Sequence, residues 1–169
     1  MSQPRLYVVF GLPFAGKSTL VRELVRQRGC RVIDIDAMNT ARGVGIDGAA
    51  ITAEEWATSF ALARMRLIAE LSAGESVAYD GHVWCRTQRD EFRAIARANG
   101  ATVTLIYLDV PESVTHARLL ANRRSPQRFD VRDELFAQAV ALMEPPDGEE
   151  GVMRYDGSEP VAAWIASLP

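Results

Sequence analysis

Lysine is almost absent from this chain. Of its 19 lysine and arginine residues, a single one, Lys17, is a lysine. A lysine ammonium is a compact point charge, whereas an arginine guanidinium is a planar fork, so the two are not interchangeable. A chain that uses arginine at every other basic position is expected to keep lysine where only the compact ammonium fits. Lys17 is therefore the first residue for which the sequence predicts a specific chemical role.

Other absences exclude whole classes of protein. The two cysteines, Cys30 and Cys85, stand far apart, so the chain has neither a disulfide framework nor a C-x-x-C or zinc-binding spacing. No apolar run approaches the roughly 20 residues of a membrane span, and the first residues lack a signal-peptide pattern. The net charge of −3 argues against a protein that coats nucleic acid. We expect a cytoplasmic protein without a membrane partner.

What the sequence does contain is a phosphate-binding loop. Residues 11–18 read Gly-Leu-Pro-Phe-Ala-Gly-Lys-Ser and match the pattern G-x-x-x-x-G-K-[ST]. In this pattern the glycines let backbone N–H groups approach phosphate oxygens, the lysine faces the outer phosphates, and the serine hydroxyl is a ligand for Mg²⁺. An apolar run at 6–10 precedes the loop and helical apolar spacing follows it, as the motif requires. The residues predicted to contact the nucleotide here are Gly11, Pro13, Phe14, Ala15, Gly16, Lys17, Ser18 and Thr19.

Predicted strands and helices alternate along the rest of the chain. The capping box that begins at Thr52 and the glycines at 29, 74 and 100 mark helix ends. This alternation predicts an α/β three-layer sandwich with a five-stranded parallel sheet, in a single domain over residues 1–169. Residues 37–51, rich in glycine and alanine, are predicted to form a mobile loop. The predicted strands are 6–10, 31–36, 77–80, 102–109 and 152–155.

Three aspartates are expected at the edge of this sheet where ligands bind. In an open parallel sheet that edge is the carboxyl end of the strands. Asp34 and Asp36 are placed on the second predicted strand and Asp80 ends the third. Phosphoryl transfer needs a metal-shell carboxylate and a base for the attacking hydroxyl. We predict Asp36 as the base and Ser18 and Asp80 as metal ligands, while Asp34 either holds a Mg²⁺ water or pairs with an arginine.

Arginines gather around a loop that Pro126 interrupts. This loop, at about 123–132, joins two predicted helices and stands where a lid would close over the transferring phosphate. Arginines in a lid stabilise the negative charge of the phosphoryl oxygens. We predict a functional role for at least one of them, with Arg123 and Arg128 as the catalytic candidates. The full set is Arg118, Arg123, Arg124, Arg128 and Arg132.

The histidines are interpreted as structural or incidental, and the tryptophans as core residues. His82 and His116 have no partners at a metal-binding spacing. Trp56, Trp84 and Trp164 are interpreted as core residues, because a large aromatic side chain is more often buried than used to stack a base. None of these five residues is predicted to belong to the site.

Taken together, the motifs resemble those of P-loop small-molecule kinases, in particular a bacterial group of ATP-binding proteins described as AAA-type. Similar proteins include chloramphenicol phosphotransferase, the zeta-toxin kinases and the polynucleotide 5′-kinases. The resemblance implies ATP and Mg²⁺ as cofactors, a base after the second strand and a lid with arginines. It also implies that adenine lies between the helix with Arg118 and the loop at Gly157. The matching segments are 11–19, Asp36, 55–56, Asp80, 118–123, 128–131 and 144–146.

Three functions fit these features. The first is a kinase that transfers the γ-phosphate of ATP to a hydroxyl of a small molecule such as an antibiotic, sugar or nucleoside. The second is a polynucleotide 5′-hydroxyl kinase, whose D-x-x-R pattern is broken here because Asn39 replaces the arginine and Arg42 is the nearest candidate. The third is a nucleotide-dependent switch with slow ATPase activity, although the N-K-x-D element of GTPases is missing. We expect a monomer or homodimer with a small-molecule acceptor, and nucleic acid is disfavoured as a partner.

Overall fold

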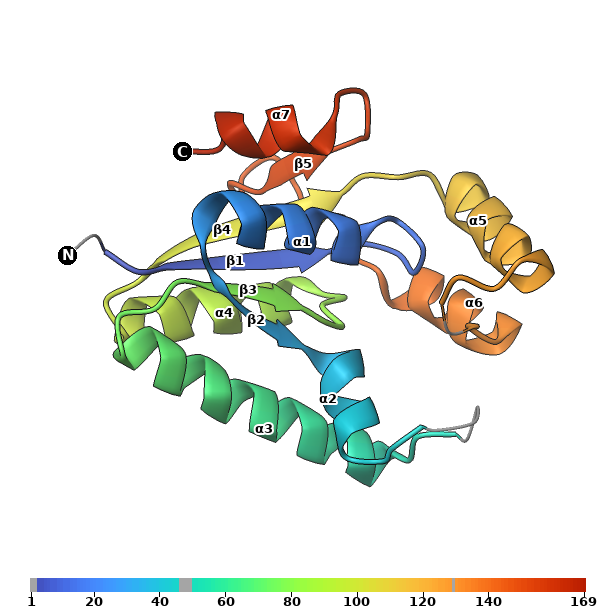
Figure 1. Ribbon diagram of the computed structural model, residues 1–169, viewed down its shortest axis with the longest axis horizontal. Coiled ribbons are helices and arrows are strands. Elements are labelled where there is room, and N and C mark those ends of the chain that lie inside the picture. The colour runs from blue at the N-terminus through green and yellow to red at the C-terminus, as the bar shows by residue number, and fades with distance from the viewer. Residues whose placement is uncertain (1–2, 46–49, 129) are drawn as a thin grey trace.

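The computed structural model describes residues 3–45, 50–128 and 130–169. Strands and helices alternate, and the sheet lies between two layers of helices (Figure 1). Within the described residues, every helix is too short or too polar to cross a lipid bilayer. The elements are β1 (Arg5–Phe10), α1 (Lys17–Arg28), β2 (Arg31–Asp34), α2 (Ile35–Ala41), α3 (Ala53–Ser72), β3 (Val77–Asp80), α4 (Arg86–Ala98), β4 (Thr102–Leu108), α5 (Glu112–Arg124), α6 (Asp133–Leu142), β5 (Met153–Tyr155) and α7 (Val161–Ser167).

The five strands form one parallel sheet in the order β2-β3-β1-β4-β5. The predicted three-layer α/β fold with a five-stranded parallel sheet is therefore confirmed. In the register of the sheet, Asp80 at the end of β3 lies beside Val9 of β1 and Asp34 of β2. The carboxyl ends of these three strands thus meet at one edge. The helices α5 and α6 lie beyond that edge, and the start of β1 and the C-terminus lie toward the opposite one (Figure 1).

Both faces of the sheet are buried, which explains the continuous apolar run of β1. Along this strand, Leu6, Val8 and Phe10 pack under α3 and α4, while Tyr7 and Val9 pack under α1 and α7. Side chains of a strand alternate between the two faces. A strand covered by helices on both sides therefore needs apolar residues at every position. This central strand ends at Phe10 and leads directly into the phosphate-binding loop.

The second strand is shorter than predicted. It ends at Asp34, and the next residues form α2, so the prediction of a strand to residue 36 and of a loop from residue 37 was wrong. The Asp34 carboxylate accepts a hydrogen bond from the Ala37 N–H at 2.9 Å and caps the new helix. The predicted loop at 37–51 is thus helical as far as Ala41, and its residues 46–49 lie outside the described part of the chain.

A buried ion pair fastens the segment after α6 to α4. Arg89 donates from Nε and Nη2 to the two carboxylate oxygens of Glu150 at 2.8 and 2.7 Å. The two side chains are only 1% and 2% exposed. A third guanidinium nitrogen, Nη1, donates to the carbonyl of Glu144 at 3.0 Å. The hydrogen bonds from Arg89 hold the pKa of Glu150 down from 4.5 to about 2.

Replacing Glu150 by alanine is expected to lower the free energy of unfolding by about 3–5 kcal/mol, because Arg89 would keep a buried charge without a counterion. The measurement is urea unfolding at pH 7. The control is Asp90→Ala, which removes the exposed partner of Arg93 and should cost about 1 kcal/mol or less.

The same ion pair predicts a dependence of stability on pH. The pKa of Glu150 is lower in the folded protein than in the unfolded chain. The contribution of Glu150 to the free energy of unfolding is therefore complete above pH 4.5 and is lost as the pH falls toward about 2. Equal destabilisation by Glu150→Ala and Asp90→Ala at pH 7 would contradict this account of the pair.

Candidate functional site

The phosphate-binding loop joins β1 to α1 at the carboxyl edge of the sheet. Gly11 has φ of 146°, and a Cβ there would lie 2.9 Å from the carbonyl oxygen of Leu108, so only glycine fits. Gly16, with φ of 107°, is the N-cap of α1. Phe14 has φ of 63°, an unusual value for a bulky residue. The loop therefore has the backbone conformation for which its glycines were predicted, with one additional strained position.

Lys17 begins α1 and turns back over the loop. Its Nζ donates hydrogen bonds to the carbonyl oxygens of Gly11 and Leu12, both at 3.0 Å. Burial lowers the pKa of the Lys17 ammonium to about 8, while the nearby Asp80 carboxylate acts in the opposite direction. The cation is thus held at the mouth of the loop, next to an acidic group.

Asp80 and Ser18 meet beside this lysine. Asp80 is buried at the end of β3, and burial raises the pKa of its carboxyl, while a hydrogen bond from the Ser18 hydroxyl and the charge of Lys17 lower it. These are hard oxygen donors, which Mg²⁺ prefers. Among the described residues, no group of three or more His, Cys, Asp or Glu side chains could hold a metal ion. The Ser18 hydroxyl and the Asp80 carboxylate nevertheless fit Mg²⁺, because this ion is usually held by one or two protein groups together with phosphates and water.

The Asp34 side chain has a different hydrogen-bonding role from those of Asp36 and Asp80. The residue lies at the carboxyl end of β2, beside Asp80 in the register of the sheet, but its carboxylate caps α2. The expected strand would have put Asp34 and Asp36 on one face, whereas the helix that starts at Ile35 separates them. A metal role for Asp34 stays a prediction.

Asp36 lies in the first turn of α2 and faces a histidine. The distance between Asp36 Oδ1 and His82 Nε2 is 3.5 Å. This hydrogen bond lowers the pKa of the Asp36 carboxyl, as do the more distant charges of Lys17 and Arg128. The predicted base therefore lies near two predicted phosphate-binding cations. The sequence predicts only a structural or incidental role for His82, and the signal that could reveal this contact is its place two residues after Asp80.

Two of the predicted arginines reach the phosphate-binding loop. Arg118 Nη1 donates to the carbonyl oxygens of Phe14 and Ala15 at 3.1 and 3.2 Å. The guanidinium carbon of Arg128 lies 4.5 Å from the centre of the Phe14 ring. The Phe14 side chain is itself buried and packs against Leu119 of α5 and against α6. The loop and the helices that flank the lid are therefore in direct contact.

Arg123 binds residues of the lid and of α6 instead of the phosphate-binding loop. Its guanidinium is 3.0 Å from Asp130 and 2.9 Å from Asp133, and it also donates to the carbonyl of Val131 at 2.8 Å. It therefore holds the lid loop against the start of α6, and its catalytic role stays a prediction. Gly157, with φ of 80°, lies in the turn between β5 and α7, where its predicted contact with adenine is likewise untested.

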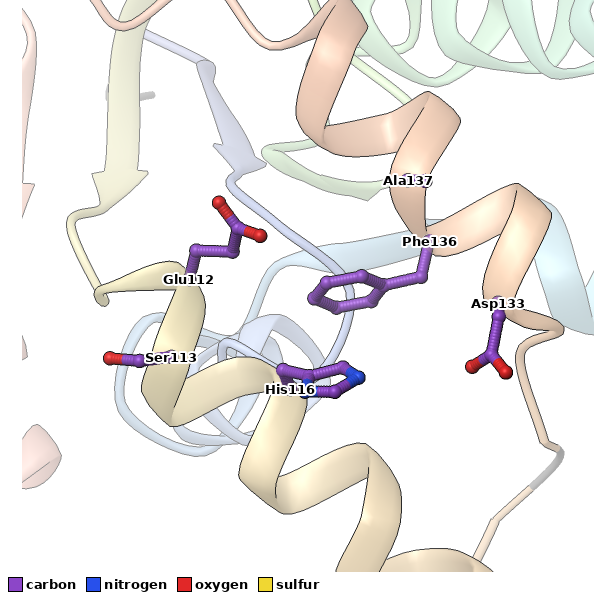
Figure 2. A pocket seen from close by; sticks show the side chains of 6 residues that line it. All are labelled: Glu112, Ser113, His116, Asp133, Phe136 and Ala137. Carbon is purple, nitrogen blue, oxygen red and sulfur yellow. The ribbon is translucent and has the colours of Figure 1, made fainter.

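An open pocket of about 440 Å³ lies between α5 and α6 (Figure 2). None of the predicted site residues lines it. Its Asp133 carboxylate is already paired with Arg123, and Phe136 turns inward to pack with Phe14. The pocket is thus lined by neither Lys17 nor Asp36, although Phe136 connects it to the loop of residues 11–18 through Phe14. Its lining residues are Glu112, Ser113, His116, Asp133, Phe136 and Ala137.

Comparison with known proteins agrees with this architecture. Among curated proteins, no sequence matches the chain. Solved structures that it resembles include a kinase candidate from Chloroflexus aurantiacus j-10-fl, with 19% identity, a TM-score of 0.74 and coverage of 98% of this chain and 94% of the other. A gluconokinase from Sinorhizobium meliloti 1021 has 20% identity, a TM-score of 0.66 and coverage of 98% and 90%. The APS kinase of Mycobacterium tuberculosis, in complex with AMPPNP and APS, has 14% identity, a TM-score of 0.66 and coverage of 98% and 95%.

These similarities in structure show a shared fold. The sequence itself goes further, because residues 6–146 match the model of the AAA_33 family, described as an AAA domain. The matched segment begins in β1 and extends past α6, so it includes the phosphate-binding loop, all three aspartates and the lid. This chain belongs to that AAA domain family.

Proposed function

We propose that this protein is a kinase that transfers the γ-phosphate of ATP to a hydroxyl group of a small molecule. The observation that carries the proposal is the meeting of Lys17 and Ser18 at the start of α1, Asp80 at the end of β3 and Asp36 at the start of α2, all at one edge of the sheet. The fold shared with a gluconokinase and with an APS kinase that binds AMPPNP supports it. We propose a cytoplasmic protein that acts as a monomer or homodimer.

Each residue has a part in this reaction. The acceptor oxygen forms a bond to the γ-phosphorus, the bond between that phosphorus and the β–γ bridging oxygen breaks, and ADP leaves. Asp36 receives the hydroxyl proton, and Lys17 and Arg128 stabilise charge on the phosphoryl oxygens. Ser18 would hold Mg²⁺, with Asp80 accepting the hydrogen bond of the serine or a metal-bound water. When bound, the ion neutralises charge on the β- and γ-phosphates.

The residues after Asp36, where the phosphate acceptor is expected to bind, favour a small molecule over the end of a nucleic acid. Asn39, which replaces the arginine of D-x-x-R, is buried and accepts a hydrogen bond from the Ser59 hydroxyl. Arg42, the nearest alternative, donates to the same hydroxyl. The Asn39 carbonyl oxygen and one Arg42 nitrogen thus have partners within the protein, between α2 and α3, whereas the buried Asn39 Nδ2 has none among the described residues. A polymer kinase needs a cation for the backbone phosphate of its substrate, and the position that D-x-x-R gives to this cation holds the neutral Asn39.

The expected result is that the protein labels small hydroxyl compounds and not oligonucleotides. Purified protein is mixed with labelled ATP and either 5′-hydroxyl DNA and RNA oligonucleotides or a panel of sugars, nucleosides and antibiotics. Binding to a single strand through phosphates would weaken with salt by a log–log slope of about −0.7 per contacted phosphate. Efficient, salt-sensitive end-labelling would contradict the proposal and favour a polynucleotide kinase. Slow ATP hydrolysis that no acceptor accelerates would favour a nucleotide-dependent switch.

A further inference from the structure

We infer that His82 is a positioning residue, which orients the Asp36 carboxylate toward the acceptor hydroxyl. The inference rests on the proposed function and assigns a role to a side chain that the reaction as described above does not use. Three independent observations support it: the course of the loop after β3, the aromatic side chains around the imidazole ring, and the contact with Asp36.

The loop after β3 brings His82 toward α2. Gly81 separates it from Asp80, and a Cβ at Gly81 would lie 2.7 Å from the Tyr79 ring and 2.9 Å from the side chain of Ile35. Because a side chain at position 81 would meet these atoms, the glycine lets the loop run tightly over the start of α2. The next residue, His82, therefore comes within reach of the first turn of that helix, where Asp36 lies.

Aromatic rings surround the imidazole on several sides. The ring centre of His82 is 4.8 Å from that of Trp56, 5.5 Å from Trp84 and 6.3 Å from Phe60. The interplanar angles of 64°, 67° and 78° are those of edge-to-face contacts, which are favourable for aromatic rings. Trp56 and Phe60 also stack on each other on α3. These rings limit the rotamers open to His82, and its Nε2 faces Asp36.

Asp36 needs such a partner because its own helix does little to fix it. Its side chain is 72% exposed, whereas that of His82 is only 32% exposed. An exposed aspartate samples several rotamers, and fixing one of them costs entropy when the substrate binds. A hydrogen bond from Nε2 to Oδ1 selects one rotamer in advance and leaves Oδ2 to receive the hydroxyl proton.

The length of this contact is compatible with that role. The 3.5 Å separation is at the long end for a hydrogen bond. Contacts of catalytic groups are often long before the substrate arrives and shorten in the complex. Nε2 can donate both in the neutral Nε2–H tautomer and in the protonated ring, so the role does not depend on a change in charge.

The test is a double-mutant cycle between His82 and Asp36. The rate of ADP formation from Mg·ATP is measured for the wild type, His82→Ala, Asp36→Asn and the double variant, and AMPPNP affinity is measured for each. We expect His82→Ala to lower kcat about 10-fold to 100-fold with unchanged AMPPNP affinity. In the Asp36→Asn background, the same substitution should have no further effect. His82→Gln, which keeps an N–H donor, should restore part of the rate.

The other histidine of the chain provides the control. His116 also contacts an aromatic ring, that of Phe136 at 5.5 Å, but on α5, and His116→Ala should leave the rate unchanged. If His82→Ala lowers the rate by the same factor in both backgrounds, the residue acts only through packing and the inference is wrong. If the wild type binds AMPPNP but forms no ADP with any acceptor, the proposed function itself fails.

Discussion

Lys17→Ala is expected to lower the rate of phosphoryl transfer by about 10²-fold to 10³-fold, the usual cost of removing one group that stabilises transition-state charge. The lysine is the single one in the chain, and its Nζ lies at the mouth of the loop, hydrogen-bonded to two loop carbonyls. Lys17→Arg should be affected less severely, because the charge is kept while the shape changes. The measurement is ADP formation from Mg·ATP in the presence of an acceptor.

The fold should survive this substitution. Lys17 is only half-buried, and the loss of two hydrogen bonds to carbonyls costs about 1 kcal/mol each. Urea unfolding and circular dichroism would separate a loss of activity from a loss of structure. Arg26→Ala is the matched control, since it removes an exposed cation from the same helix. Unchanged ATP turnover in folded Lys17→Ala protein would contradict the assignment of the loop as the phosphate site.

Asp36→Asn is expected to lower the transfer rate by about 10²-fold to 10⁴-fold, the usual contribution of a general base. AMPPNP affinity should change little, because the carboxylate is proposed to act on the acceptor hydroxyl in the transition state. Asp80→Asn should instead raise the Mg²⁺ concentration needed for activity, because Asp80 is proposed to serve the metal together with the neighbouring Ser18. For both variants, the transfer rate is measured at steady state and the AMPPNP affinity by titration, each at several Mg²⁺ concentrations.

Asp34→Asn is the third member of this series. Asparagine caps a helix about as well as aspartate, so the start of α2 should be preserved while the charge is removed. A raised Mg²⁺ requirement in this variant would show that Asp34 also serves the metal. If Asp36→Asn mainly weakens Mg·ATP binding and Asp80→Asn does not, the roles given to these two residues are reversed.

The features that the sequence predicted well are those encoded within short segments. The loop pattern, the apolar strand before it and the capping box at Thr52 each lie within a few residues, and the structure shows all three. The end of β2 was harder to predict because Ile33 to Asp36 continues the strand-like alternation of apolar and polar residues. Only the hydrogen bond that the Ala37 N–H donates to the Asp34 carboxylate shows that the aspartate caps a helix instead of continuing the strand.

The surroundings of Asp36 could not be predicted because they depend on contacts between distant segments. Trp56 is on α3, while His82 and Trp84 are in the loop after β3, and the fold brings them together. In the sequence these residues are separated by a helix and a strand. Residue type alone predicted core packing for the tryptophans, which the structure shows for Trp164, whereas Trp56 and Trp84 are only partly buried.

Phe14 makes the phosphate-binding loop and the helices beyond it parts of the same hydrophobic core. Its backbone has the unusual φ of 63°, and its ring is enclosed by Leu119, Phe136 and the Arg128 guanidinium. The space filled by this ring is therefore shared between the loop of residues 11–18 and the helices α5 and α6. Because Phe14 packs against both helices, a change in the conformation of the loop would require α5 and α6 to repack around its ring. The amino acid at position 14 thus limits which side chains α5 and α6 can carry where they meet it.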